Sequence, residues 1–229
     1  MWYNKYMLTL AATPIGNYAD TSARLIKKLQ EADMILAEDT RVFIDLLKRL
    51  NLRINARITS FHDHNESSKL SKILDAIEKE DVVLVSDAGL PLINDPGYKL
   101  VQAAIDNDVL VTCIPGPSAP LTALVLSGLP VHKFTFEGFL PPKTSSRITA
   151  LQKLAQEKRT MIFLESKHRI TRCLEDMNEV FGPKRRGAIC RELTKQHEEI
   201  VRASLAELVE TSRRQQLKGE ICLVIDGSR

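Results

Sequence analysis

Residues 82–97 read VVLVSDAGLPLINDPG, a short apolar run followed by a loop that holds two carboxylates, two glycines and two prolines. The apolar run at 82–85 predicts a buried strand near 82–86, because such runs fill the interior of parallel sheets. Gly89 and Gly97 permit backbone angles that other residues avoid. Open α/β sheets bind ligands outside the carboxyl ends of their strands. The segment therefore predicts a ligand-binding loop, with a long surface turn as the alternative.

The composition is that of a globular protein with one large domain or two smaller ones. The chain has 229 residues, of which 44% are hydrophobic. No run approaches the ~18 apolar residues of a membrane span, so no membrane partner is expected. The apolar stretch at 7–12 is too short for a signal peptide and predicts a first strand. Cys113, Cys190 and Cys222 lie in strand-like runs, which predicts reduced core thiols and a cytoplasmic location.

Charge is distributed unevenly along the chain. The formal net charge is +3; residues 1–120 carry 13 basic and 16 acidic side chains, and residues 121–229 carry 19 and 13. A basic half is typical of a polyanionic partner such as nucleic acid. Solvated helix faces are the alternative interpretation.

Apolar β-type runs alternate with amphipathic stretches from end to end, which predicts an α/β fold with a largely parallel first sheet. Asp20 and Asn65 are expected to cap helices at 23–29 and 70–77. The proline-rich stretch at 115–120 predicts a boundary between domains 1–115 and 116–229. Strands at 199–203 and 220–225 are expected to pair antiparallel, giving a mixed second sheet. The remaining strands are expected near 33–37, 57–61, 109–114, 133–138, 160–165 and 187–191, and the remaining helices near 42–50, 98–105, 119–127, 145–157, 168–180 and 204–214.

Other expected strand ends also lead into polar loops. The loop at 12–17 has a single glycine, which argues against NAD, FAD and P-loop chemistry; Pro14 could offer an apolar wall or sit in a plain turn. Residues 38–41 read Glu-Asp-Thr-Arg and predict either a structural ion pair with a helix cap or the polar floor of a pocket. His62 and His64 lack further ligands at a useful spacing, so no functional metal is expected. Together with similar loops at 164–169 and 190–195, these features favour a cleft between two α/β halves.

Seven motifs, in this order and spacing, resemble the ribosomal RNA small subunit methyltransferase I family. They are Ala12–Asn17, Glu38–Arg41, Ser86–Gly97, Pro115–Ala119, Phe139–Pro141, Glu165–Arg169 and Arg191–Glu199. That family belongs to the tetrapyrrole-methylase-like, class III S-adenosylmethionine-dependent methyltransferases. Lys167 stands where the family motif has proline. The resemblance implies two α/β domains of the tetrapyrrole methylase type, with the cofactor cleft between them, and a homodimer.

The resemblance also implies an activity, a cofactor and the residues that contact it. The activity is 2′-O-methylation of a cytidine in the decoding region of 16S rRNA, free or in the small ribosomal subunit. The cofactor is S-adenosylmethionine, and its contacts would fall on Pro14, Asp87, Ala88, Gly89, Leu90, Ser118, Ala119, Leu164, Leu193 and Gly219.

Transfer to a ribose hydroxyl calls for a base, because that hydroxyl is a very weak acid. Glu38, Asp39 and His62 are the candidates, and the sequence does not choose among them. Arg41 would hold a phosphate or order the site, as would Arg169 and Arg191. Phosphate contacts with RNA are expected from a compact basic set in the second domain: Lys167, Arg169, Arg172, Lys184, Arg185 and Arg186.

Two other functions are compatible with the same fold. One is a methylase of a tetrapyrrole or another small molecule, which the basic second half disfavours. The other is a non-catalytic module that binds S-adenosylmethionine, which the presence of Asp87, Gly89, Gly97 and Gly116 disfavours. A strong salt dependence of substrate binding would favour RNA, because released counterions drive that association.

Overall fold

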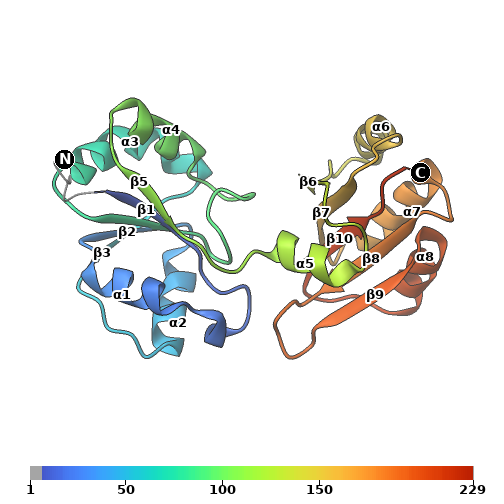
Figure 1. Ribbon diagram of the computed structural model, residues 1–229, viewed down its shortest axis with the longest axis horizontal. Helices are drawn as coiled ribbons and strands as arrows, with labels where there is room; N and C mark the ends of the chain where they lie inside the picture. Colours follow the sequence, from blue (N-terminus) through green and yellow to red (C-terminus); the bar gives the residue numbers. More distant parts are fainter. Residues whose placement is uncertain (1–6, 229) are drawn as a thin grey trace. The chain divides into compact units, whose positions relative to one another are not determined.

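The computed structural model describes residues 7–228 and divides the chain into two compact units, Met1–Ser118 and Ala119–Arg229. The division falls three residues beyond the boundary expected from the proline-rich stretch. Each unit contains a five-stranded sheet with helices packed on it (Figure 1). The α/β class expected from the sequence is confirmed. No helix within residues 7–228 has the length and apolarity needed to cross a membrane.

The first sheet is entirely parallel, as predicted, in the order β3-β2-β4-β1-β5. Its central strand β4 pairs with β1 and β2 in level register, so that Val85 lies beside both Ala11 and Ala37. The carboxyl ends of the strands therefore meet at one edge. The strands are β1 (Leu8–Ala11), β2 (Met34–Ala37), β3 (Arg57–Ser60), β4 (Val82–Val85) and β5 (Val111–Ile114).

Helices cover both faces of the first sheet (Figure 1). On one face, α1 (Ala23–Glu31) and α2 (Thr40–Arg49) bury Leu25 and Phe43 against Ile35 and Val83. On the other, α3 (Asp63–Ile77) and α4 (Tyr98–Asp106) pack on the alternate strand residues. This arrangement is the expected one, because successive residues of a strand point to opposite faces.

Both predicted helix caps are wrong by a few residues. Ser22 caps α1, since its hydroxyl accepts a hydrogen bond from the Leu25 amide at 3.0 Å. Asp20 instead lies in a preceding 3₁₀ helix, η1 (Tyr18–Asp20). His62 occupies the cap of α3, and the Asn65 side chain reaches back to accept from the His62 amide at 3.0 Å. The side chain of a capping residue accepts from the backbone amide two or three positions ahead. Asp20 lies too far before α1 to do this, and Asn65 lies inside α3.

The second sheet is mixed, in the order β6-β7-β10-β8-β9. Strands β6 and β7 are parallel, and β10 runs antiparallel between β7 and β8. The mixed sheet was predicted, but the expected pairing of β9 with β10 is wrong. The short connection at 192–198 folds β9 back onto β8 as a hairpin, which leaves β10 to fill the central position. The strands are β6 (Phe134–Phe139), β7 (Thr160–Ser166), β8 (Arg186–Arg191), β9 (Glu199–Ser204) and β10 (Glu220–Ile225).

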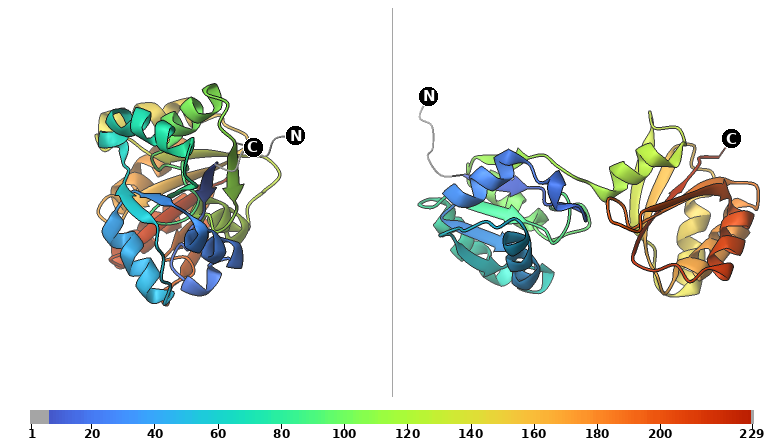
Figure 2. Two further views of the ribbon diagram at one scale, coloured as in Figure 1. Left: turned by 90° about the vertical axis from the view of Figure 1, so that its left-hand side faces the viewer. Right: turned by 90° about the horizontal axis from the view of Figure 1, so that it is seen from below.

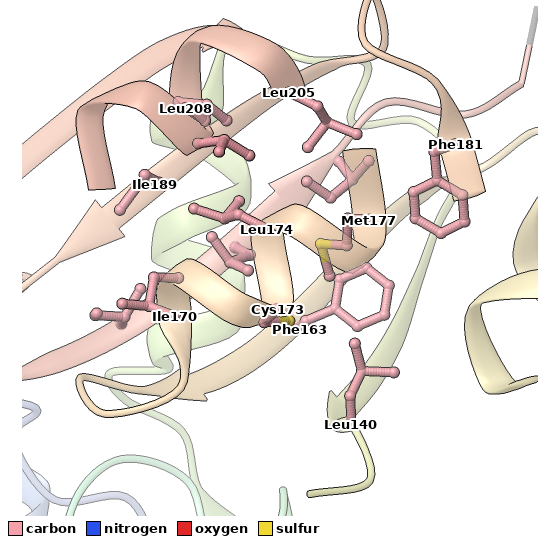
Figure 3. Close-up of a cluster of buried hydrophobic side chains, with 14 of the residues drawn as sticks. Leu140, Phe163, Ile170, Cys173, Leu174, Met177, Phe181, Ile189, Leu205 and Leu208 are labelled. Carbon is pink, nitrogen blue, oxygen red and sulfur yellow. The ribbon is translucent and has the colours of Figure 1, made fainter. Parts of the chain in front are cut away.

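Helices pack on both faces of the second sheet (Figure 2). The helices α6 (Thr144–Leu154), α7 (Ile170–Phe181) and α8 (Leu205–Arg214) enclose a large apolar core. In that core Phe163 lies among Cys173, Met177 and Leu140 (Figure 3). The opposite face carries α5 (Ala119–Ser127), whose Ala123 carbonyl accepts from the Cys190 thiol at 3.7 Å.

The cysteines are free thiols, and the predicted core location is correct for Cys190 and Cys222. Cys113 is exposed, so that prediction is wrong. It lies on β5, an edge strand that pairs only with β1, and an edge strand leaves part of its surface uncovered. Cys173, which lies on α7 and not in a strand-like run, is buried.

A buried ion pair links α6 to α7. The Arg147 and Asp176 side chains are 2% and 3% exposed, and the guanidinium Nε donates to the carboxylate at 2.6 Å. Arg147 also donates to the carbonyls of Pro141 and Pro142. The surrounding groups thus satisfy the guanidinium, as a buried charge requires.

Replacing Arg147 with methionine should lower the free energy of unfolding by about 3 kcal/mol, because it removes the nearer of the two cations that pair with a buried carboxylate; Arg172, at 3.7 Å from Asp176, remains. Urea denaturation of the two proteins measures this loss. Arg49→Met provides the control, since Arg49 forms an exposed pair with Asp45, and such pairs contribute little. Equal midpoints for the wild type and Arg147→Met would contradict the assignment.

Candidate active site

The carboxyl edge of the first sheet gathers most of the residues expected to form a site in the first unit. Pro14 follows β1, Glu38 follows β2 and His62 follows β3, while the loop at 86–97 follows the central strand β4. Ser118 follows β5 and ends the unit. The parallel topology alone brings these positions to one edge, although they are far apart in the sequence.

The loop after β4 is fixed to the loop after β1 by its backbone. The Thr13 amide donates to the Gly89 carbonyl at 2.9 Å, and the Gly89 amide donates to the Thr13 carbonyl at 3.2 Å. The Ser86 hydroxyl adds a hydrogen bond to the Gly89 carbonyl at 3.0 Å. These contacts bring Asp87, Ala88 and the half-buried Leu90 next to the end of β1.

Only glycine suits position 89. Its φ of +87° lies in the left-handed region, and an added Cβ would come within 3.2 Å of Ile15 Cγ2 and 3.5 Å of the Pro117 carbonyl oxygen. Three segments of the chain therefore meet at the Gly89 backbone, and the left-handed φ is the main reason for the glycine.

Residues 38–41 include the structural ion pair and helix cap that the sequence left open. Asp39 caps α2 and forms an ion pair with Arg41 at 2.6 Å. The hydrogen bonds from Arg41 lower the pKa of Asp39 to about 2. The Asp39 amide in turn donates to the Asp87 carboxylate at 2.9 Å, which joins the loops after β2 and β4. Asp39 and Arg41 thus form the structural ion pair and helix cap, whereas Glu38 lies part-buried beside the carboxylates of Asp87 and Asp95.

Glu38 is the most perturbed acid of this edge. Burial raises the pKa of Glu38 to about 7, and the neighbouring carboxylates of Asp95, Asp87 and Asp63 add to the effect. Burial likewise raises the pKa of Asp95 to about 6, although a hydrogen bond with Ser86 opposes the shift. Crowded carboxylates disfavour their own ionisation. Glu38 is therefore poised to gain or lose a proton near neutral pH.

His62 is held by its role at the start of α3. The His62 Nε2 atom lies 2.9 Å from the side-chain nitrogen Nδ2 of Asn65. That nitrogen can only donate, so Nε2 accepts the hydrogen bond. Its Nδ1 is buried and has no hydrogen-bond partner. The His62 and His64 rings stand 6.0 Å apart. Within residues 7–228, no group of three or more His, Cys, Asp or Glu side chains is arranged to hold a metal ion.

The second unit brings its own expected residues to one edge of its sheet. Leu164 lies near the end of β7, Leu193 follows β8, and Gly219 precedes β10. Leu193 is buried and Leu164 is half-buried. Gly219 has a φ of +86°, and a Cβ there would overlap the Glu192 carboxylate. The absence of a side chain at Gly219 thus has a packing explanation within the second unit.

The sequence suggested that the six basic residues expected to contact RNA form one compact set. In the structure they form two separate groups. Lys167, Arg169 and Arg172 lie at the start of α7, whereas Lys184 and its neighbours follow the end of that helix. The 12 residues of α7 separate the two groups by about 18 Å. Neighbours in sequence are thus placed at opposite edges of the second sheet.

Three of these six side chains are occupied within the protein. Arg169 donates to the Glu165 carboxylate at 3.0 Å and to the Leu140 carbonyl at 2.7 Å. Arg172 pairs with Glu175. Arg185 donates to the carbonyls of Asp226 and Ala155. The other three are exposed and have no ion pair within the described part of the chain: Lys167, Lys184 and Arg186.

Asp95 is the residue of this edge that the sequence did not single out as a site residue. The sequence did contain an indication of its role, because Asp95 is the second carboxylate of the loop at 86–97. A carboxylate eight positions from Asp87 carries no fixed spatial relation to Glu38 in the sequence. The loop path brings it close enough to raise the pKa of Glu38.

The model of the tetrapyrrole (corrin/porphyrin) methylase family matches residues 7–209, and the chain belongs to that family. The solved structure of the methyltransferase CobJ is similar, with a TM-score of 0.72 and 20% identity over 98% of this chain and 95% of that one. At this identity the likeness shows the fold alone.

Within this class, the chain belongs to the ribosomal RNA small subunit methyltransferase I family. The protein of that name from Mycobacterium tuberculosis is 51% identical over 222 residues, which are 96% of this chain and 78% of the relative. The one from Escherichia coli O157:H7 is 44% identical over 228 residues, covering 97% of this chain and 78% of the relative. The resemblance carried by the seven motifs is confirmed.

Proposed function

We propose that this protein transfers a methyl group from S-adenosylmethionine to the ribose 2′-hydroxyl of a cytidine in the decoding region of 16S rRNA. The observation that carries the proposal is 51% identity over 96% of the chain to a protein named ribosomal RNA small subunit methyltransferase I. The substrate is 16S rRNA, free or within the small ribosomal subunit, and the protein acts in the cytoplasm. Its working form is the homodimer that the family resemblance implies.

The carboxyl edge of the first sheet suits the proposed cofactor in its charge and in the groups that it offers. S-adenosylmethionine, when bound, supplies an electrophilic methyl group on a positively charged sulfonium. Glu38, Asp87 and Asp95 crowd negative charge at this edge, and a nearby cation would relieve their repulsion. Pro14 adds a buried apolar group. The cofactor has no phosphate, in keeping with the loop at 12–17, which has no phosphate cradle.

Further cofactor contacts are proposed from the resemblance at the chain connection and in the second unit. They fall on Ser118 and Ala119 at the start of α5, and on Leu164, Leu193 and Gly219. The amides at the start of a helix suit an anionic group such as the carboxylate of the methionine tail. The leucines supply apolar contact for the adenine.

Glu38 is the proposed general base. A base is most effective when its pKa lies near the working pH, and the pKa of Glu38 is about 7. The low pKa of Asp39, about 2, makes it a weak base. His62 already accepts a hydrogen bond at Nε2. Glu38 would accept the proton of the ribose hydroxyl, while Arg41 orders the start of α2 through Asp39.

The proposal is tested by offering the purified protein labelled S-adenosylmethionine with 16S rRNA, small ribosomal subunits, 23S rRNA or a tetrapyrrole. Label in 16S rRNA, free or in the subunit, that is stable to base and located on a cytidine ribose is the expected result. Label in the tetrapyrrole and none in the RNA would contradict the proposal and favour a small-molecule methylase.

Activity should survive exhaustive chelation, because methyl transfer from a sulfonium requires no Lewis acid and His62 and His64 lack further ligands. The measurement compares initial rates before and after treatment with EDTA, with the RNA refolded in monovalent salt. Restoration of a lost rate by one specific divalent ion would contradict this expectation.

A further inference from the structure

The second sheet has two edges, and they differ in charge. At the carboxyl edge, β7 and β8 end and β10 begins. At the opposite edge, here called the amino edge, β6, β7 and β8 begin and β10 ends. The residues expected to contact the cofactor in this unit lie toward the carboxyl edge.

The amino edge brings together basic residues from three separate parts of the chain. The Lys133 carbonyl accepts from the Thr160 amide at 3.2 Å, which places the start of β6 beside that of β7. The Arg186 carbonyl accepts from the Asp226 amide at 2.9 Å, which joins the start of β8 to the end of β10. The amino-edge patch formed in this way consists of Lys133, Lys158, Arg159, Lys184, Arg185 and Arg186.

The balance of charge distinguishes the two edges. Residues 132–133, 157–160, 183–186 and 225–228 carry six basic side chains and two acidic ones, Glu157 and Asp226. Residues 165–169, 191–199 and 218–220, at the carboxyl edge, carry five of each sign. The amino edge therefore has a net charge of +4, and the carboxyl edge has none.

Most of the charge of the amino-edge patch is available to a partner. Lys133, Lys158, Lys184 and Arg186 are exposed and form no ion pair with any residue between 7 and 228. Arg159 is paired with Glu157 at 2.7 Å, and Arg185 is held by backbone carbonyls. At the carboxyl edge, by contrast, Arg169, Arg191 and Lys195 are each paired with a glutamate.

We propose that the amino-edge patch binds phosphates of the substrate RNA at a distance from the reacting ribose. The inference rests on the proposed function and names the surface that docks the RNA. The strands of this sheet separate the two edges by about 20 Å. The patch therefore contacts a different segment of the RNA from the one near Leu164 and Gly219. Lysines that neutralise phosphates release counterions, and this contributes affinity without reading sequence.

The test compares two triple variants with matched chemistry. Lys133, Lys158 and Lys184 are replaced by glutamine in the first variant. The control replaces Lys72, Lys79 and Lys153, which are also exposed and have no ion pair among residues 7–228. Binding of the full-length proteins to a transcript of the 16S decoding region is measured between about 0.05 and 0.3 M salt, a range over which counterion release is readily seen. Melting temperatures verify that both variants are folded.

The first variant should bind roughly tenfold or more weakly, with a slope of log affinity against log salt smaller by about 2–3, since each phosphate contact contributes roughly 0.7–0.9. The control should match the wild type. Equal slopes for the first variant, the control and the wild type would overturn the proposal, even if the wild type methylates the RNA. A wild type that neither binds nor methylates the transcript or the small subunit would overturn the proposed function itself.

Discussion

Replacing Glu38 with glutamine will slow methyl transfer by roughly 10²–10⁴-fold, the contribution typical of a positioned general base. Glutamine keeps the size of the side chain but cannot accept the proton. The wild-type rate should rise with pH through the pKa of Glu38, which is about 7 before the cofactor binds and lower beside the bound sulfonium, because only the ionised carboxylate acts as a base. The Glu38→Gln variant should lack this rise. Rates under single-turnover conditions measure both effects.

A matched variant separates Glu38 from the histidine that could produce a similar profile. His62→Gln should retain the rise near pH 7, because His62 is engaged with Asn65 and does not take the proton. Loss of the rise in His62→Gln, together with its survival in Glu38→Gln, would identify His62 as the base and contradict the assignment.

The raised pKa of Glu38 can also be verified without any activity measurement. The folded-state pKa of about 7 lies above the ordinary value of 4.5, so the folded protein binds the proton more tightly than the unfolded chain does. Stability from this group is complete below pH 4.5 and declines as pH rises through 7. Glu38→Gln should therefore melt at a higher temperature than the wild type at pH 8, with a smaller difference at pH 5. A difference independent of pH would contradict the shift.

Replacing Gly89 with valine will reduce the affinity for S-adenosylmethionine by roughly 100-fold, about 2.7 kcal/mol. A β-branched residue is strained at a φ of +87°, and its Cβ would press on Ile15 and approach Pro117. The loop that carries Asp87 and Leu90 must then shift. Calorimetric titration with S-adenosylmethionine measures the loss.

Gly182 offers the matched control for this substitution. Its φ is +91°, and nothing lies within 4 Å of an added Cβ. Gly182→Val introduces similar backbone strain in the other unit without displacing the loop after β4. It should lower the melting temperature but preserve cofactor affinity. A folded Gly89→Val protein with wild-type affinity would show that this loop does not bind the cofactor.

The strands were predictable because each is a short apolar run bounded by polar or turn residues. The strand expected near 82–86 is an example: β4 comprises Val82–Val85, one residue shorter than expected. The start of α3 was not predictable in this way. The polar residues at 63–69 have no apolar periodicity, and Glu66 is buried there because its carboxylate accepts from the amides of Lys99 and Leu100. Only the fold brings that helix end to Glu66.

The candidate site was predictable in its position but not in its chemistry. Parallel strands guaranteed that Glu38, His62 and Asp87 would share one edge. The choice among the bases needed the ion pair of Asp39 with Arg41 and the approach of Asp95 to Glu38. The prediction of one compact basic set failed for a related reason. Lys167 and Lys184 are close in sequence, but α7 lies between them and places them at opposite edges of the sheet.

The central claim is tested most directly by mapping ribose methylation across small-subunit RNA from cells that lack this protein. The account predicts that one 2′-O-methyl mark, on a cytidine of the decoding region, disappears. The intact gene should restore the mark, and a gene encoding Glu38→Gln should leave it largely absent. A methylation map identical in the presence and absence of the protein would contradict the account.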